Sequence, residues 1–241
     1  MPPGALAELE TALRVTQAYG RLAKTHSHRA VREDSLGLLR GRDAITADWI
    51  GRGPQTLQIT ADLGEMVAFT AEVEGHSWRG HRWVWLEDGR VIREVLVEDT
   101  GLAREAPADH PPLGELRAGR GQYSAGPDAI LPTDFDPAAK RLADKLHQAW
   151  NGRAFDLYSA GWLTSLVTTL PDATFHFERA ICLHEQTAIL WRVHGHHRYG
   201  QRVRLIGSSV MGPGDSDDTL LDQAAMAAQL RRQIIDYSKA G

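Results

Sequence analysis

Hydrophobic residues at helical spacing open the chain. Leu6, Leu9 and Leu13 recur every three or four positions. Acidic side chains, Glu8 and Glu10, stand early in this segment, and basic ones, Arg21 and Lys24, stand late. This pattern predicts an amphipathic helix over residues 5–24, with charges that complement the helix dipole.

The period of the pattern changes to two from Gln55 onward, which indicates β-strands. The elements expected in this half of the chain are a short strand at 29–34, a helix from about residue 42, strands at 57–60, 65–75, 81–86 and 91–98, a tight turn at 75–80, and a hairpin turn at 88–89. The first hundred residues therefore predict helices followed by an antiparallel meander.

A segment rich in proline and glycine, residues 101–135, follows the meander and has the composition of a linker. The elements expected after it are a helix from residue 136, strands at 174–181, 185–195 and 202–210, and a C-terminal helix at 218–237. The sequence thus predicts a first domain at 1–100, a linker at 101–135 and a second domain at 136–241.

The two halves share an internal repeat. When residues 65–82 are shifted by 120 positions, seven of the 18 positions are identical: Glu65 and Glu185, Ala68 and Ala188, Val73 and Val193, Gly75 and Gly195, His76 and His196, Gly80 and Gly200, Arg82 and Arg202. This predicts two copies of one unit. The alternative is a coincidence between two turns rich in glycine, histidine and arginine.

Composition restricts the partners that we expect. The net charge of −4 provides no basic field for a phosphate backbone, so we expect no nucleic acid. No apolar run approaches the ~20 residues that cross a bilayer, and no secretory signal is visible, so we expect no membrane partner. The single cysteine, Cys182, excludes an intrachain disulfide and fits a cytoplasmic location.

Several short motifs, in their order, resemble the nuclear transport factor 2-like superfamily and its SnoaL-like branch, relatives of polyketide cyclases and ketosteroid isomerases. The matching stretches are GLLRGRDAI at 37–45 and WVWLEDGRVI at 83–92 in the first half, and LPD at 170–172, AILWRVHGH at 188–196 and GQRVRLIG at 200–207 in the second. The resemblance implies an α+β fold of two tandem cone-like units. Each would be a curved antiparallel sheet wrapped around helices, and the two would pack as a pseudo-dimer.

The second half departs from the family pattern. Between Phe155 and Pro171 there is little room for a first strand and the helix after it, and the final hairpin is missing after Val210. We therefore expect a degenerate second unit with a smaller or closed pocket, partly covered by the C-terminal helix.

The resemblance also implies a site in the first unit. Asp34 matches the catalytic base, and the proton-donor position falls on His81. Trp83 and Trp85 share a strand face with His81, and Tyr19 of the first helix could line the same pocket. This implies a polyketide cyclase/isomerase-type enzyme that uses acid–base chemistry, without a cofactor, on a small hydrophobic or aromatic ligand. The alternative is a non-catalytic small-molecule-binding protein of the same fold.

Structural readings of these residues remain open. Asp34 could cap a turn, His81 could lie at a hairpin end, and the tryptophans and Tyr19 could be packing residues. His194 and His196 share a strand face, and His184 and His197 lie near them, but no acidic ligand stands at convincing spacing. We therefore expect no metal. The chain is expected to be a monomeric pseudo-dimer or a homodimer.

Overall fold

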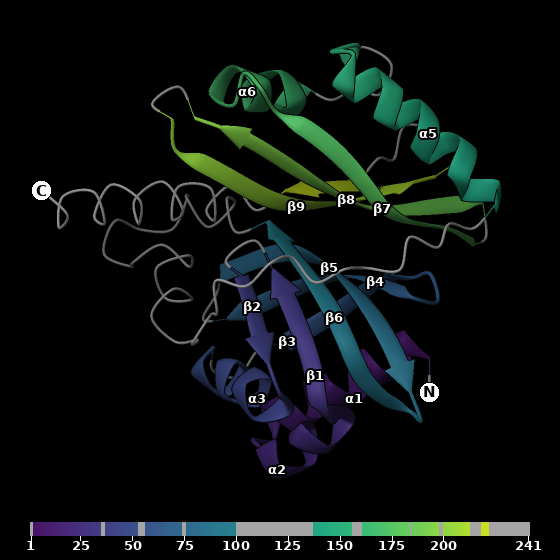
Figure 1. The fold of residues 1–241 in the computed structure, drawn as a ribbon. Helices are drawn as coiled ribbons and strands as arrows, with labels where there is room; N and C mark the ends of the chain where they lie inside the picture. The colour runs from purple at the N-terminus through teal and green to yellow at the C-terminus, as the bar shows by residue number, and fades with distance from the viewer. Residues whose placement is uncertain are drawn as a thin grey trace, which may run out of the picture. The chain divides into compact units, whose positions relative to one another are not determined.

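The computed structural model describes residues 2–34, 37–52, 56–73, 76–99, 137–155, 161–183, 185–197, 200–212 and 218–221 (Figure 1). The chain divides into two compact units, whose described parts are residues 2–99 (unit 1) and 137–221 (unit 2). The predicted linker at 101–135 lies outside the described residues. Within the described residues, no helix is both long and apolar enough to cross a bilayer.

Unit 1 is a six-stranded sheet with helices on one face (Figure 1). Its helices are α1 (Pro3–Val15), α2 (Tyr19–Leu22), the 3₁₀ turn η1 (Ala23–Thr25) and α3 (Arg42–Gly51), and its strands are β1 (His26–Asp34), β2 (Gly37–Arg40), β3 (Thr56–Asp62), β4 (Met66–Val73), β5 (His76–Glu87) and β6 (Arg90–Asp99). The strand order is β2-β1-β6-β5-β4-β3. All pairs are antiparallel except β1 with β6, which brings the start of the unit beside its last strand.

The first helix is shorter than the pattern predicts. It ends at Val15, where Gln17 takes a left-handed backbone with φ of 54°, and the short helix α2 begins at Tyr19. Thr16 assists the ending, because its hydroxyl donates back to the carbonyl of Ala12 at 2.7 Å. The single helix predicted over 5–24 is therefore wrong, although both pieces carry apolar residues into the core.

The turn predicted at 75–80 is also wrong. Strand β5 already begins at His76, and Gly80 lies inside it, directly opposite Phe69 of β4. A Cβ atom at Gly80 would clash with the Phe69 ring, so glycine is required here by close packing and not by a turn. The hairpin turn at Asp88 and Gly89 is confirmed, with φ of 50° and 73°, as in a type I′ turn.

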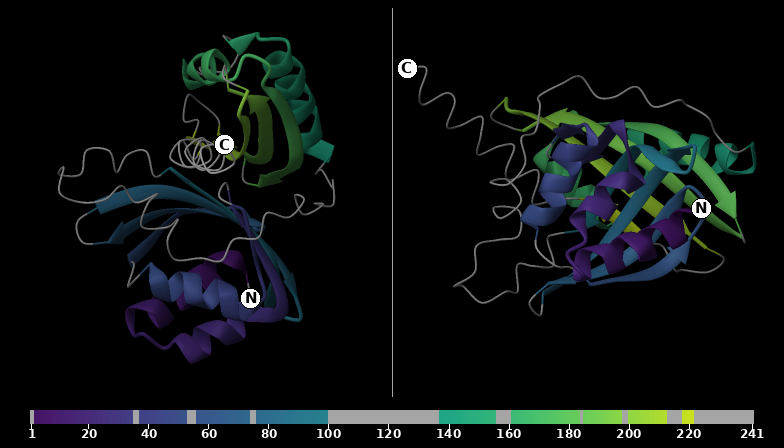
Figure 2. Two further views of the ribbon diagram at one scale, coloured as in Figure 1. Left: turned by 60° about the vertical axis from the view of Figure 1, so that its left-hand side comes forward. Right: turned by 90° about the horizontal axis from the view of Figure 1, so that it is seen from below.

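Unit 2 is a four-stranded antiparallel sheet with two helices on one face (Figure 2). Its elements are α5 (Pro137–Asn151), α6 (Gly161–Thr169), β7 (Thr174–Leu183), β8 (Gln186–His196), β9 (Arg202–Met211) and β10 (Asp218–Leu221). The order β10-β9-β8-β7 repeats the order β6-β5-β4-β3 of unit 1. Two units with one strand order agree with the predicted tandem arrangement.

The repeat is clearest at a strand glycine beneath an aromatic ring. In unit 1, Phe69 pairs with Gly80 across β4 and β5. In unit 2, Trp191 pairs with Gly207 across β8 and β9, and a Cβ atom there would clash with the indole. Next to each aromatic residue, the neighbouring strand carries a β-bulge, after Ile59 in β3 and after Phe177 in β7. Both sheets therefore bend at the same place.

The ungapped shift of 120 residues does not describe this equivalence. Gly80 lies within a strand, whereas Gly200 lies in a turn with φ of 83°. Arg82 is buried, whereas Arg202 is exposed at the start of β9. Because the two units differ in loop lengths, no single offset aligns them.

The predictions for the end of unit 2 need correction. Residues 218–221 form strand β10, which pairs with β9, so a final strand is present after Val210 and the helix predicted from 218 is wrong over these four residues. The rest of that predicted helix lies outside the described residues. No strand precedes β7 in the described parts of residues 137–173, as expected. The packing of the two units as a pseudo-dimer stays a prediction.

The glycine–aromatic pair provides a test of the fold. Gly80→Ala should lower the free energy of unfolding by about 1–3 kcal/mol, because the added methyl forces the Phe69 ring to move. Gly20→Ala is the matched control, since nothing lies within 4 Å of a Cβ atom there. Urea unfolding measures both variants. Equal stabilities of the two variants would contradict the assignment.

Candidate functional site

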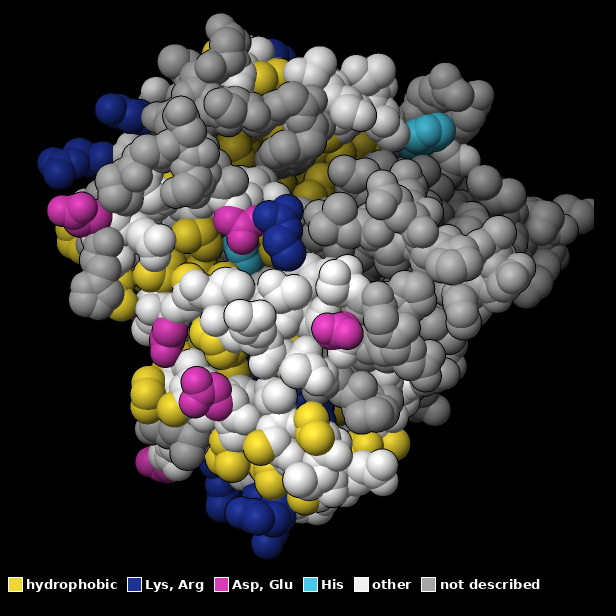
Figure 3. Space-filling view, turned by 180° about the vertical axis from the view of Figure 1, so that it is seen from behind, with side chains coloured by type: hydrophobic (Ala, Val, Ile, Leu, Met, Phe, Trp, Pro, Cys, Tyr) yellow, Lys and Arg dark blue, Asp and Glu magenta, His cyan; other side chains and the backbone are white. Residues whose placement is uncertain are grey.

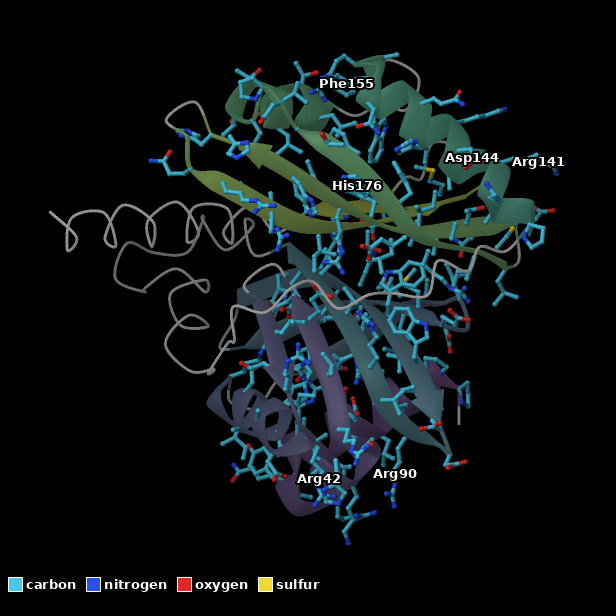
Figure 4. The ribbon with its side chains drawn as sticks, viewed as in Figure 1. Arg42, Arg90, Arg141, Asp144, Phe155 and His176 are labelled. Carbon is cyan, nitrogen blue, oxygen red and sulfur yellow. The ribbon has the colours of Figure 1, made fainter. Side chains whose placement is uncertain are left out.

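The inner face of the unit 1 sheet, the face covered by α1 and α3, carries charged side chains. Alternation along β6 puts Glu94 and Glu98 on this face, and Arg82 of β5 points the same way because it bonds Glu10 of α1. Arg32 of β1 joins them. Figure 4 draws the described side chains as sticks, and on the face drawn in Figure 3 the charged side chains of the described residues are scattered.

Arg82 is the centre of one end of this network. Its guanidinium donates to Glu10 and, through Nε at 2.6 Å, to Glu94. His26 stands between the same two carboxylates, with Nδ1 3.8 Å from Glu10 Oε1 and Nε2 3.5 Å from Glu94 Oε1. All four side chains are buried. The carboxylates of Glu10 and Glu94 therefore both contact the guanidinium of Arg82 and the ring of His26, and all four groups are shielded from water.

The contacts of the Thr25 hydroxyl indicate which ring nitrogen of His26 carries a hydrogen. The Thr25 hydroxyl lies 2.8 Å from Glu10 Oε1, 2.7 Å from the Leu22 carbonyl and 2.9 Å from His26 Nδ1. The two oxygens can only accept, and the hydroxyl has one hydrogen to give. The contact with His26 is therefore favourable when Nδ1 carries a hydrogen, and we assign the ring in that form.

Trp49 of α3 lies at the other end of the network. Three guanidinium groups stand against its ring, with centroid distances of 4.1 Å for Arg14, 4.1 Å for Arg32 and 4.9 Å for Arg52. Such contacts attract a cation to the indole face, and more strongly where water is excluded. The buried Trp49 therefore gathers three arginines from α1, β1 and the end of α3.

Carboxylates bind two of these arginines. Asp48 Oδ2 accepts from Arg32 Nη1 at 2.7 Å and from Arg52 Nε at 2.8 Å. Glu98 accepts from Arg52 Nη1 at 2.9 Å, and from the indole of Trp78 at 2.9 Å. Arg32 also reaches Glu94 at 2.5 Å, and so connects the two ends of the network.

Electrostatics within the network displace several pKa values. Burial would raise the pKa of Glu10 and of Glu94, but neighbouring cations, Arg82 for Glu10 and Arg32 with Arg82 for Glu94, lower both pKa values below the ordinary one. Burial would lower the pKa of Arg82, but Glu10 and Glu94 raise it. Arg14 differs, because burial, with repulsion from the other arginines, outweighs Glu10 and lowers its pKa to about 10.

The buried polar atoms of the network that have no hydrogen-bond partner among the described residues include Arg32 Nη2, Trp49 Nε1 and Asp48 Oδ1. Buried polar groups are almost always bonded to protein, water or a ligand, so such atoms mark places where something else binds. All three belong to residues in direct contact with one another at the Trp49 end.

The residues that the resemblance selected fall on both faces of the sheet. Asp34 is 3% exposed and, two residues after Arg32 along β1, lies on the inner face. His81 and Trp83 are fully buried, but they alternate with Arg82 and so lie on the outer face. The structure therefore does not bring Asp34 and His81 to one face.

Trp85 and Tyr19, the other two residues that the resemblance selected, are both half-buried. Trp85 shares the outer face and is half-buried, with the Arg93 guanidinium 5.8 Å from its ring. Tyr19 is half-buried at the start of α2 and packs against the core. Their roles, like those of Asp34 and His81, stay predictions.

The network itself was missed by the sequence analysis. One signal was available, because Glu10 stands on the apolar stripe between Leu6 and Leu13 of α1, where a charge needs a partner. On β6, a bulge at Ile92 shifts the pairing between Trp85 and Leu86. A shift of one residue turns side chains to the other face of a sheet, and it carries Glu94 inward.

Unit 2 has a different interior. Trp150 of α5 packs edge-on against Phe175 and Trp191, with ring centroids 5.4 Å and 5.2 Å away. The two histidines that the sequence singled out contact different residues. The ring centroids of His194 and His176 are 5.3 Å apart, whereas Nδ1 of His196 lies 2.7 Å from Oδ2 of Asp172.

Metal binding by these histidines gains no support among the described residues. No group of three or more His, Cys, Asp or Glu side chains there is arranged to hold a metal ion. Bonds from the backbone and side chain of His196 lower the pKa of Asp172, as in a surface ion pair. His184 lies outside the described residues.

Comparison with known proteins found matches among solved structures. No protein-family model and no curated protein matches the chain. A ketosteroid isomerase candidate from Kribbella flavida is 18% identical and covers 45% of this chain and 80% of its own, with a TM-score of 0.35. A SnoaL-like polyketide cyclase candidate from Shewanella putrefaciens is 14% identical and covers 44% and 85%, with a TM-score of 0.36.

A third structure has a ketosteroid isomerase-like fold and comes from Catenulispora acidiphila, in complex with trimethylamine. It is 13% identical and covers 46% of this chain and all of its own, with a TM-score of 0.37. Each likeness spans less than half of this chain. Structures of the kinds that the resemblance named are thus among the matches, and at these identities and TM-scores they carry no further conclusion.

The lowered pKa values of Glu10 and Glu94 predict acid sensitivity. A carboxylate whose pKa is lower in the folded chain binds fewer protons when folded. Its contribution to stability is therefore present above the ordinary pKa of 4.5 and is lost as pH falls below it. Urea unfolding at pH 3–7 should show a steep loss of stability below about pH 5.

Glu94→Gln tests the source of this loss. At pH 7 it should destabilise by about 3–5 kcal/mol, because Arg32 and Arg82 lose a buried partner, and it should flatten the dependence on pH. Asp144→Asn is the control, since Asp144 on α5 pairs with Lys140 in solvent (Figure 4) and should matter by less than about 1 kcal/mol. Equal effects of the two variants would show that the network does not govern acid stability.

Proposed function

We propose that unit 1 binds a small molecule between its sheet and its helices, and that the ligand presents an oxygen acceptor to Arg32 and Trp49. The observation that carries the proposal is the pair of buried N–H groups, Arg32 Nη2 and Trp49 Nε1, for which no described residue supplies an acceptor. A donor left without a partner costs about 1–3 kcal/mol, so a ligand oxygen there is favourable.

The lining favours a polar ligand over a purely hydrophobic one. The sequence implied a hydrophobic cone with a histidine beside two tryptophans, but the inner face carries arginines and carboxylates instead. Moving an apolar molecule among them would gain little, whereas an oxygen-bearing molecule is held by directional bonds. An aromatic ring in the ligand is compatible, because guanidinium groups stack on ring faces.

Trp49→Phe tests this site. It removes the indole N–H but keeps a ring against the arginines. A compound that raises the melting temperature of the wild type, from a thermal-shift screen of aromatic ketones, steroid-like ketones, amides and carboxylates, should bind this variant about tenfold more weakly. Trp78→Phe is the matched control, because its indole already donates to Glu98. The proposal fails if both variants lose the shift equally, or if no compound produces one.

Acid–base catalysis of the polyketide cyclase/isomerase type is the second candidate. It is favoured by the burial of Asp34 on the inner face, two residues from Arg32 and so about 7 Å along the strand. In this scheme Asp34 takes a proton from a carbon or oxygen of the ligand. Arg32 and Trp49 then donate to the oxygen on which negative charge develops, in the place that the resemblance gave to His81.

Asp34→Asn separates the enzyme from the binding protein. For any compound that binds, its conversion is followed by NMR. The variant should lose at least ~10²-fold in turnover, because the amide cannot accept the proton, while the thermal shift remains. Glu33→Gln is the control, since Glu33 is the adjacent buried carboxylate and pairs with Arg93 at 3.6 Å. Loss of turnover in His81→Gln would instead restore the pair that the resemblance selected. Absence of turnover in the wild type leaves the binding protein.

A further inference from the structure

Charge is unevenly distributed along the network of unit 1. At the Trp49 end, three guanidinium groups stand against one indole, and Asp48 and Glu98 are the carboxylates that bond there. Glu10 lies at the opposite end with Arg82, and Glu94 divides its two oxygens between Arg32 and Arg82. Three guanidinium groups are therefore concentrated around Trp49, where Asp48, Glu98 and one oxygen of Glu94 accept hydrogen bonds from Arg32 and Arg52.

Arg14 is affected by this concentration of guanidinium groups. Its guanidinium stacks on Trp49, and its Nε donates to a backbone carbonyl of its own helix at 3.3 Å. Burial lowers its pKa to about 10, and Arg82, Arg32 and Arg52 contribute to this, while Glu10 opposes it. A group whose charged form is disfavoured by like charges is stabilised when an anion binds nearby.

Two buried donors without a described acceptor, Arg32 Nη2 and Trp49 Nε1, lie at this end. Arg32 Cζ is 4.1 Å from the centre of the Trp49 ring, and the guanidinium stacks on that ring. Its Nη2 and the indole Nε1 are therefore within reach of the two oxygens of one carboxylate. A carboxylate accepts charge-assisted bonds that are about twice as strong as neutral ones.

From these observations we infer that the ligand of unit 1 carries a carboxylate, and that Arg32 Nη2 and Trp49 Nε1 hold its two oxygens. This rests on the proposed function and adds the charge of the ligand to it. The unfilled Asp48 Oδ1 lies beside the same guanidinium and accepts a hydrogen from a ligand hydroxyl or amide group. The ligand class is thus a small carboxylic acid with a hydrogen-bond donor near its carboxylate.

The test observes the indole N–H directly in the full wild-type chain. The seven tryptophans give seven indole signals in a ¹H–¹⁵N spectrum, and the signal missing from Trp49→Phe assigns Trp49. Sodium glycolate, which carries a carboxylate and a hydroxyl, is titrated to ~100 mM, because a fragment of this size binds weakly. Glycolamide is the neutral isostere, and sodium chloride controls for ionic strength.

Saturable movement of the Trp49 signal with glycolate, and not with glycolamide or chloride, is the expected result. The signals of Trp78 and Trp191 should stay in place, since their indoles already donate to Glu98 and Ser209. Movement with glycolamide alone would overturn the carboxylate and leave the proposed function standing. No movement with either compound, together with an empty thermal-shift screen, would overturn both.

Discussion

The buried pairing of arginines with carboxylates in unit 1 is the interaction on which that unit depends. Hydrophobic contact is non-directional, and a sheet packed on helices by apolar residues alone tolerates sliding. Arg32 cannot slide, because it must meet Asp48 on α3 and Glu94 on β6 at once. The same holds for Arg82, which spans from Glu94 to Glu10 on α1. The network thereby fixes α1 and α3 against the sheet, at the cost of removing these charges from water.

The period of two predicted the strands of unit 1 well, but it did not predict which of their side chains face the helices. A period of two identified β3 to β6, and the Asp88–Gly89 turn was found because only a few residue pairs adopt its backbone. Yet the same period could not say which face was inner, because strands such as β5 and β6 are buried on both faces. His81 was selected by counting back along β5, and its neighbour Arg82 has the inner position.

Two further features could not be read from the chain. The bulge at Ile92 moves the side chains that follow it in β6 to the opposite face of the sheet, and the residues around it do not predict a bulge. Gly80 was taken for a turn residue, as strand glycines are when the ring packed on them is distant in sequence. The two units share the strand glycine and the bulge but differ inside, because unit 1 adds buried ion pairs to its apolar core, whereas aromatic rings pack together in unit 2. The fold therefore does not determine what either interior binds.

The parallel pairing of β1 with β6 has a consequence for how unit 1 is made. Glu10 and Arg32 belong to the first third of the unit, whereas Glu94 and Glu98 lie on its last strand. During synthesis, Arg32 emerges well before Glu94, one of the two carboxylates that it bonds, because 62 residues separate them along the chain. A partial chain can therefore collapse only with uncompensated charges inside, which is strongly unfavourable. The network of unit 1 is therefore complete only once strand β6, which carries Glu94 and Glu98, has been synthesised.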